Sequence, residues 1–146
     1  MQDVIIYIKK DKEALKIIDI IESTNTSVEL LSLKASIYAD QDKSKEALII
    51  YNALIAKVDI SLLLRLGRAI ANTDLKMHQE SINDLTYIIN KQPSSKIYNY
   101  RAEIKYGLSD IKGTFDDYKK SAEKGDSIAI LNIRGMYKKY PEAKNW

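Results

Sequence analysis

The side chains that most often catalyse reactions or bind metals are scarce in this sequence. It contains one His, His78, and no Cys. A lone imidazole without any thiolate cannot supply the ligands of a zinc site, so we expect His78 to lie in a solvent-exposed loop. Asp116 and Asp117 are neighbours, and on a helix neighbours point about 100° apart, which indicates a solvated face rather than an acid–base pair.

Sequence signatures of catalysis are missing as well. The five glycines form neither a Gly-x-Ser-x-Gly elbow nor a phosphate-binding loop. We therefore predict that the chain is not an enzyme and carries no cofactor or metal.

Two groups of side chains are better suited to binding than to catalysis. Arg65 and Arg68 stand one helical turn apart. They can offer planar forks to a ligand carboxylate, or pair with Asp or Glu of a neighbouring helix. Tyr98, Tyr100 and Tyr106 cannot all face one core, so a binding role for at least one of them is an alternative to packing.

Composition limits the class of protein. The chain has 146 residues, of which 45% are apolar, and a net charge of +3. Seven Gly and Pro together leave little material for β-turns. The short apolar run at residues 4–8 is no signal peptide, and the longest uncharged stretch, 47–56, cannot span a membrane. We expect a soluble, cytoplasmic, all-α protein.

Charge is unevenly distributed. Residues 1–93 carry a net charge of −1, whereas residues 94–146 carry +4. This asymmetry is compatible with an acidic partner at the C-terminal end, although solubility alone also explains it. Nucleic-acid binding usually needs a denser basic stripe.

Apolar residues recur at spacings of three and four, as in Ala14, Ile17, Ile18 and Ile21, which predicts amphipathic helices. Capping signals lie at Thr26–Glu29 and at several Asp residues, and Pro93 is a stop signal. These patterns predict about nine antiparallel helices, over 2–9, 11–23, 27–40, 43–57, 60–73, 78–91, 95–107, 110–124 and 126–140.

The helices repeat at a regular interval of about 34 residues. Small residues that open every second helix stand at Ala14, Ala47, Ser81 and Thr114. In the intervening helices the small positions are interpreted as Ala35, Gly67 and Ala102. With that register, the spacing from Gly67 to Ser81 is longer than the spacings from Ala35 to Ala47 and from Ala102 to Thr114. The difference predicts a longer loop near 75–77. Because one hairpin cannot bury its apolar face alone, the hairpins must stack.

This pattern resembles the tetratricopeptide repeat (TPR) family. Arg101-Ala102, the run Asp117–Lys120 and Pro93 carry the resemblance most clearly, and residues 121–137 look like the SEL-like variant. The resemblance implies an all-α, right-handed superhelical solenoid forming one domain over 1–146. Its parts would be a partial repeat at 1–26, full repeats at 27–59, 60–93 and 94–125, and a half repeat or capping helix at 126–146.

The resemblance also implies a concave groove lined by the first helix of each pair, which binds a peptide or partner protein. By this analogy the groove displays Glu29, Ser32, Ser36, Ser61, Leu64, Arg65, Arg68, Lys96, Asn99, Tyr100, Glu103 and Tyr106. Ser32 and Ser36 replace the Lys and Asn with which some members hold a chaperone carboxylate, so that clamp is not expected. An acidic or extended peptide near Arg65, Arg68 and Lys96 is compatible with the groove.

The C-terminal helix leaves two interpretations open. It is a capping helix with Arg134, Lys138 and Lys139 on its outer face, or it associates end-on, with itself or a partner, through Tyr137, Tyr140 and Trp146. The function expected from the whole pattern is a non-catalytic adaptor with no membrane contact. The alternatives are an RNA-binding helical repeat or a regulatory segment of a larger enzyme or complex.

Overall fold

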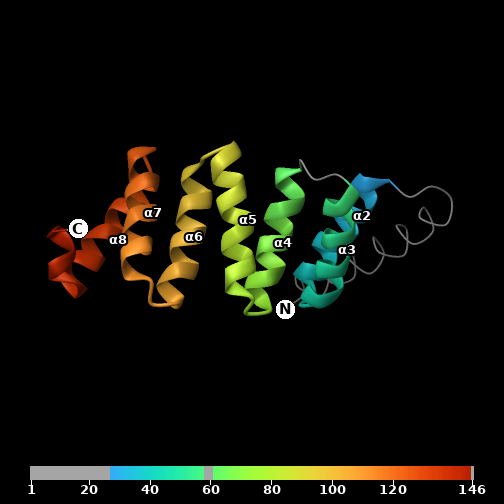
Figure 1. Ribbon diagram of the computed structural model, residues 1–146, viewed down its shortest axis with the longest axis horizontal. Coiled ribbons are helices and arrows are strands. Elements are labelled where there is room, and N and C mark those ends of the chain that lie inside the picture. The colour runs from blue at the N-terminus through green and yellow to red at the C-terminus, as the bar shows by residue number, and fades with distance from the viewer. Residues whose placement is uncertain (1–26, 58–60, 146) are drawn as a thin grey trace, which may run out of the picture. The chain divides into compact units, whose positions relative to one another are not determined.

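The computed structural model of the chain describes residues 27–57 and 61–145. Seven α-helices and a short 3₁₀ helix make up this part, and no strand occurs in it (Figure 1). The elements are α2 (Val28–Asp40), α3 (Ser44–Lys57), α4 (Leu62–Asp74), α5 (His78–Lys91), α6 (Ser95–Gly107), α7 (Ile111–Glu123), α8 (Ser127–Lys139) and η1 (Pro141–Asn145). The predicted helices from residue 27 onward are confirmed within two residues at each end. The count is seven rather than about nine, because the predicted helices at 2–9 and 11–23 lie outside the described residues.

Local signals explain where these helices begin and end. Ser27 caps α2 through a hydrogen bond that its hydroxyl accepts from the amide of Leu30, at 3.1 Å. Asp110 and Asp126 cap α7 and α8 in the same way. Such caps satisfy amides that have no partner within the helix. Helix α5 ends two residues before Pro93, as its stop signal predicts.

The chain divides into two compact units, one ending at Met77 and the other beginning at His78. In the first unit, α3 packs against both α2 and α4, and α2 also contacts α4. Its core is built around Ala35, Ala47, Tyr51, Leu54 and Leu64. The two alanines are fully buried and allow the close helix contact that the repeat pattern predicts.

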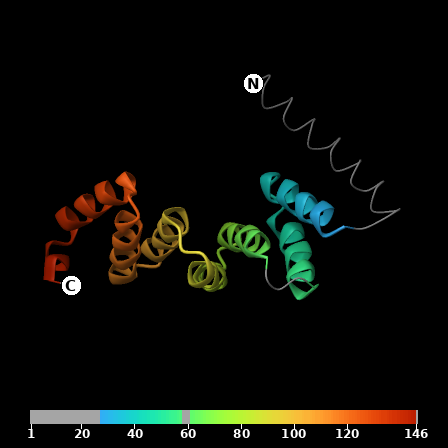
Figure 2. The ribbon, with the colours of Figure 1, turned by 90° about the horizontal axis from the view of Figure 1, so that it is seen from above.

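In the second unit, α6 contacts α5 and α7, and α8 packs on α7 and η1 (Figure 2). Phe115, with no exposed surface, lies at the centre of a core that includes Ala102, Tyr118 and Met136. Ala143 of η1 is buried in the same core. The 3₁₀ helix thus covers part of the apolar surface that a terminal half repeat would otherwise expose.

The predicted longer loop at 75–77 is wrong. Each connection from a first to a second helix has three residues, and its middle residue has a positive φ: Asp42 at 59°, Lys76 at 63° and Ser109 at 62°. The buried small residue of α4 is Ala69, with no exposed surface, and not Gly67. Ala69 follows Ala35 by one repeat and precedes Ala102 by one repeat, so the register needs no insertion.

Across the described residues, no helix is long and apolar enough to cross a bilayer.

Candidate functional site

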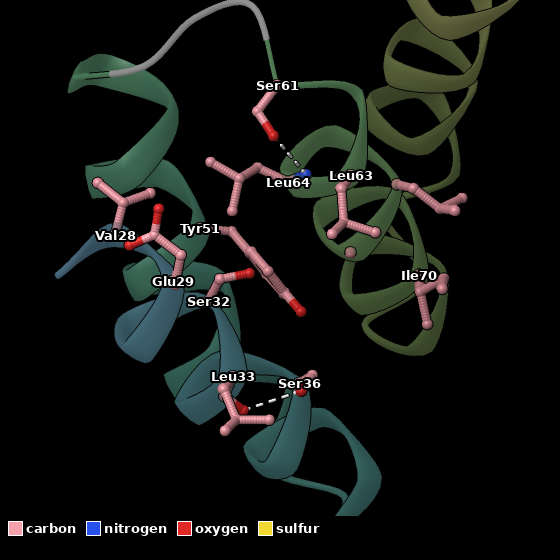
Figure 3. A pocket seen from close by; sticks show the side chains of 12 residues that line it. Val28, Glu29, Ser32, Leu33, Ser36, Tyr51, Ser61, Leu63, Leu64 and Ile70 are labelled. Carbon is pink, nitrogen blue, oxygen red and sulfur yellow. Dashed lines mark hydrogen bonds between the residues drawn. The ribbon is translucent and has the colours of Figure 1, made fainter. Parts of the chain in front are cut away.

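A groove of about 570 Å³ lies between α2 and α4 in the first unit. Figure 3 shows the ring of Tyr51, which comes from α3, reaching into the space between the two helices. The twelve residues that line it are Val28, Glu29, Ser32, Leu33, Ser36, Tyr51, Ser61, Leu63, Leu64, Leu66, Gly67 and Ile70.

The corrected repeat register explains which α4 residues reach the groove. Leu63, Leu66 and Ile70 stand one repeat after Glu29, Ser32 and Ser36, respectively. Equivalent positions on successive first helices face the same side of stacked hairpins. The predicted groove residues Ser32, Ser36 and Leu64 do line the groove, as do Glu29 and Ser61.

The α4 wall of the groove is apolar and accessible. The exposed fractions are 71% for Leu63 and 40% for Ile70, and on α2 the value for Leu33 is 51%. Leu64 is nearly buried, with 2% exposed, so it forms part of the wall without offering much surface. Large apolar side chains gathered in one hollow are typical of a binding surface rather than of random exposure.

Two serines of the groove are hydrogen-bonded to the backbone of their own segments. The Ser36 hydroxyl donates to the carbonyl of Leu33 at 2.8 Å, and the Ser61 hydroxyl accepts from the amide of Leu64 at 3.3 Å. Burial raises the pKa of Tyr51, with a smaller contribution from Asp40. Glu29 is the only charged residue among the described lining residues, which include no Lys or Arg.

Gly67 creates the depth of the groove beside Tyr51. A Cβ atom at this position would lie 2.4 Å from Cζ of Tyr51, closer than packed atoms allow. The absence of a side chain therefore lets the ring lie across α4.

Arg65 and Arg68 do not line this groove. Arg68 instead donates from Nη1 to Oδ1 of Asn52 on α3, at 3.0 Å. Their assignment to the groove followed from the misplaced register at Gly67. The alternative, an ion pair with Asp or Glu of a neighbouring helix, stays a prediction, since the partner of Arg68 on α3 is an amide.

The predicted site residues of α6 are spread over several surroundings. Lys96 and Glu103 are exposed, and Tyr100 is half-buried. Asn99 donates from Nδ2 to Oδ2 of Asp126 at 3.0 Å. Tyr106 lines a second, smaller pocket between α6 and α8.

The sequence pattern also points to four further residues. Tyr137 lies against Phe115, with ring centroids 5.1 Å apart, and Tyr140 packs on the same core. Both contribute to the fold of the second unit, and Trp146 lies outside the described residues. His78 is the first residue of α5 and is half-buried, so its expected place in an exposed loop is wrong.

Asp117 forms a buried ion-pair cluster, which the sequence did not predict. Its carboxylate accepts from Arg101 Nε at 2.9 Å and Nη2 at 2.6 Å, and Lys105 Nζ lies 2.9 Å away. Asp116 is exposed, so the two neighbouring carboxylates do not act as a pair. No cluster of three potential metal ligands occurs among the described side chains.

Sequence reasoning missed Leu63, Leu66 and Ile70, although a signal was present. The repeat spacing shared by Ala35, Ala69 and Ala102 places all three leucine and isoleucine positions in the groove. Gly67 obscured this spacing, because Gly67 and Ala69 are both small and stand two positions apart.

No protein-family model matches the chain, and neither does any curated protein. Solved structures with similar folds are TPR domains. The first TPR of Spaghetti (RPAP3) bound to the HSP90 peptide SRMEEVD is 21% identical, with a TM-score of 0.69 over 78% of this chain and 93% of that one. The NMR structure of the first TPR domain of human RPAP3 is also 21% identical, with a TM-score of 0.67 over 81% and 95%.

A tetratricopeptide repeat protein from Parabacteroides merdae reaches a TM-score of 0.72 at 18% identity, over 94% of this chain and 56% of that one. These likenesses establish the fold predicted from the sequence. The SEL-like character of residues 121–137 stays a prediction. The chain thus has the fold of tetratricopeptide repeat domains.

Proposed function

We propose that the chain is a non-catalytic scaffold whose groove between α2 and α4 binds a short apolar segment of a partner protein or peptide. The observation that carries this proposal is the accessible apolar surface of Leu33, Leu63 and Ile70 inside one hollow. Removing such surface from water drives association, at about 25 cal/mol for each Å².

The similar fold of the Spaghetti TPR, which binds a peptide, supports a peptide as the kind of ligand. A terminal carboxylate is not the expected anchor in this groove, because Ser32 and Ser36 offer hydroxyls where a clamp needs Lys or Asn. The anchor is instead a Leu, Ile, Met or Phe side chain seated against Leu63 and Ile70.

The acidic partner expected from Arg65, Arg68 and Lys96 remains a prediction, and the groove proposal does not depend on it. RNA binding is disfavoured for this groove, because single strands are held by basic side chains and several stacking aromatics. Its described lining offers one aromatic ring and no Lys or Arg.

The proposal is tested with peptides selected from a random displayed library against the intact chain. We expect the selected sequences to share an apolar anchor. Leu63→Glu combined with Ile70→Glu weakens their binding at least tenfold in fluorescence anisotropy, because a charge would have to be buried against the anchor.

Ile49→Glu is the matched control, because Ile49 is 69% exposed on α3 and does not line the groove. It should leave the affinity within about twofold. Equal losses in the control and in the groove variant, or selected peptides without an apolar anchor, would refute the groove as the binding site. Circular dichroism of all variants checks that the helices are retained.

A further inference from the structure

Tyr106, the penultimate residue of α6, and Lys139, the last residue of α8, meet inside the second unit. Lys139 Nζ donates to the Tyr106 hydroxyl at 2.7 Å and lies 5.2 Å from the centre of its ring. The hydroxyl of Tyr140 also hydrogen-bonds Lys139, whose Nζ is 5.4 Å from the Tyr140 ring. The Lys139 ammonium and the hydroxyls of Tyr106 and Tyr140 therefore lie close together.

Tyr106 and Lys139 border a pocket of about 270 Å³. Leu131, with 62% of its surface exposed, forms an apolar wall, and Gly135 has open space where a Cβ would stand. Tyr118, Asn132 and Met136 complete the described lining, in which Lys139 is the only charged residue. A ligand can therefore approach the backbone of α8 between a cation and an accessible Leu.

The hydrogen-bonding capacity of the cluster favours an anion. An ammonium group has three donors, and a phenol that accepts from Lys139 keeps its own proton to donate. The hydrogen bond from Lys139 is the main cause that lowers the pKa of Tyr106, and the reciprocal bond raises the pKa of Lys139. The lysine thus stays protonated, and the phenol is a stronger donor than an isolated tyrosine.

We propose that the pocket formed by Tyr106, Leu131 and Lys139 is a second recognition site, which binds a carboxylate next to an aliphatic side chain in a partner peptide. One ammonium balances the single charge of a carboxylate, whereas phosphate recognition in peptides relies on clusters of Arg. The net charge of +4 over residues 94–146 attracts the same kind of partner.

This site is separate from the groove between α2 and α4. It shares no residue with that groove, and the positions equivalent to Tyr106 and Lys139 in the first unit are Ala39 of α2 and Asp74 of α4, neither of which is a cation. The inference rests on the proposed function only in taking the ligand to be a peptide.

The test is NMR titration of the intact, ¹⁵N-labelled chain with N-acetyl-Leu-Glu N-methylamide, and with the same peptide carrying Gln. We expect the amides of Gly135 and Lys139 to shift with the Glu peptide, and the Gln peptide to bind at least fivefold more weakly. Lys139→Gln should remove the response, and Tyr106→Phe should weaken it.

Lys138→Gln is the matched control, because Lys138 is the exposed neighbour of Lys139 and does not line the pocket. It should leave the titration unchanged. The proposal is overturned if Lys138→Gln weakens binding as much as Lys139→Gln, if the Gln peptide binds equally well, or if inorganic phosphate produces the same shifts at lower concentration.

The same titration separates this site from the groove. The Leu63→Glu, Ile70→Glu variant should keep the full response to the Glu peptide, because neither residue belongs to the pocket. Loss of the response in that variant would overturn the second site, whereas failure of the groove experiment alone would leave it standing.

Discussion

At the scale of single residues, two glycines in first helices have opposite surroundings. A methyl group on Gly67 would collide with the Tyr51 ring, whereas one on Gly135 would meet nothing within 4 Å. Replacing glycine by alanine therefore tests packing at Gly67 and helix propensity at Gly135.

Gly67→Ala is expected to destabilise the chain by about 1–3 kcal/mol, because the ring must move out of a packed position. Gly135→Ala, its control, should stabilise the chain by about 0.5–1 kcal/mol, since Ala is the better helix former. Urea denaturation followed by circular dichroism measures both. Equal stabilisation by the two substitutions would show that Tyr51 does not occupy the space above Gly67.

Asp117 is a buried carboxylate that pairs with two cations. Its side chain is 3% exposed, and its partners Arg101 and Lys105 are 14% and 17% exposed. Asp117→Asn should cost about 3 kcal/mol, because two cations stay largely buried without a counter-charge. The exposed neighbour provides the control: Asp116→Asn should change the free energy of unfolding by less than about 0.5 kcal/mol. Similar effects of the two substitutions in urea denaturation would contradict the ion-pair cluster.

At the scale of elements, the helices are predictable because their signals are local. Capping side chains, Pro93 and the spacing of apolar residues act within a few positions, and they fixed all seven described helices to within two residues. The register between helices is not local. Gly67 and Ala69 are both small, and only the packing against α3 distinguishes the contact position from the groove position.

The register between helices also limits how far the candidate site can be predicted from the sequence. The sequence assigns Ser32 and Ser36 to a groove, and both line the hollow between α2 and α4, because Ala35 lies unambiguously between them; their part in binding stays a prediction. It misplaces Arg65 and Arg68, because their assignment depends on the register of α4. The meeting of Tyr106 with Lys139 was also missed, since the contact joins two helices far apart in the sequence and no local pattern indicates it.

Two N-caps allow a comparison of helix ends. Asp126 accepts hydrogen bonds from the amides of Ile128 and Ala129, at 2.9 and 3.0 Å, whereas the side chain of Ser94 makes no capping bond. Asp126→Ala should cost about 1–2 kcal/mol, measured by thermal denaturation. Ser94→Ala should be nearly neutral. A larger loss at Ser94 than at Asp126 would contradict the capping geometry.

At the scale of the whole molecule, each unit has one core tyrosine with a raised pKa. Burial is the main cause at both Tyr51 and Tyr118, and nearby Asp40 and Glu103 add to it. The unfolded chain, with a tyrosine pKa of about 10, then loses these protons first. Stability is therefore complete below about pH 10 and falls as the pH rises through the folded-state pKa values.

We expect the midpoint of urea unfolding to fall between pH 9 and pH 11. The Tyr51→Phe, Tyr118→Phe variant should show a smaller fall, because Phe has no proton to lose. Any loss from the missing hydrogen bond to Asn132 is present at every pH and cancels in the comparison. An identical alkaline loss in the variant would exclude these two tyrosines as its source.

The groove between α2 and α4 is proposed to bind an apolar peptide segment. The most direct measurement is the set of backbone amides whose NMR signals shift when a peptide selected against the wild-type chain is added. The shifts should cluster at Ser32, Ser36, Gly67 and Ile70, and they should disappear in the Leu63→Glu, Ile70→Glu variant. Shifts that cluster around Ile49 on α3, or that persist unchanged in the variant, would contradict the account.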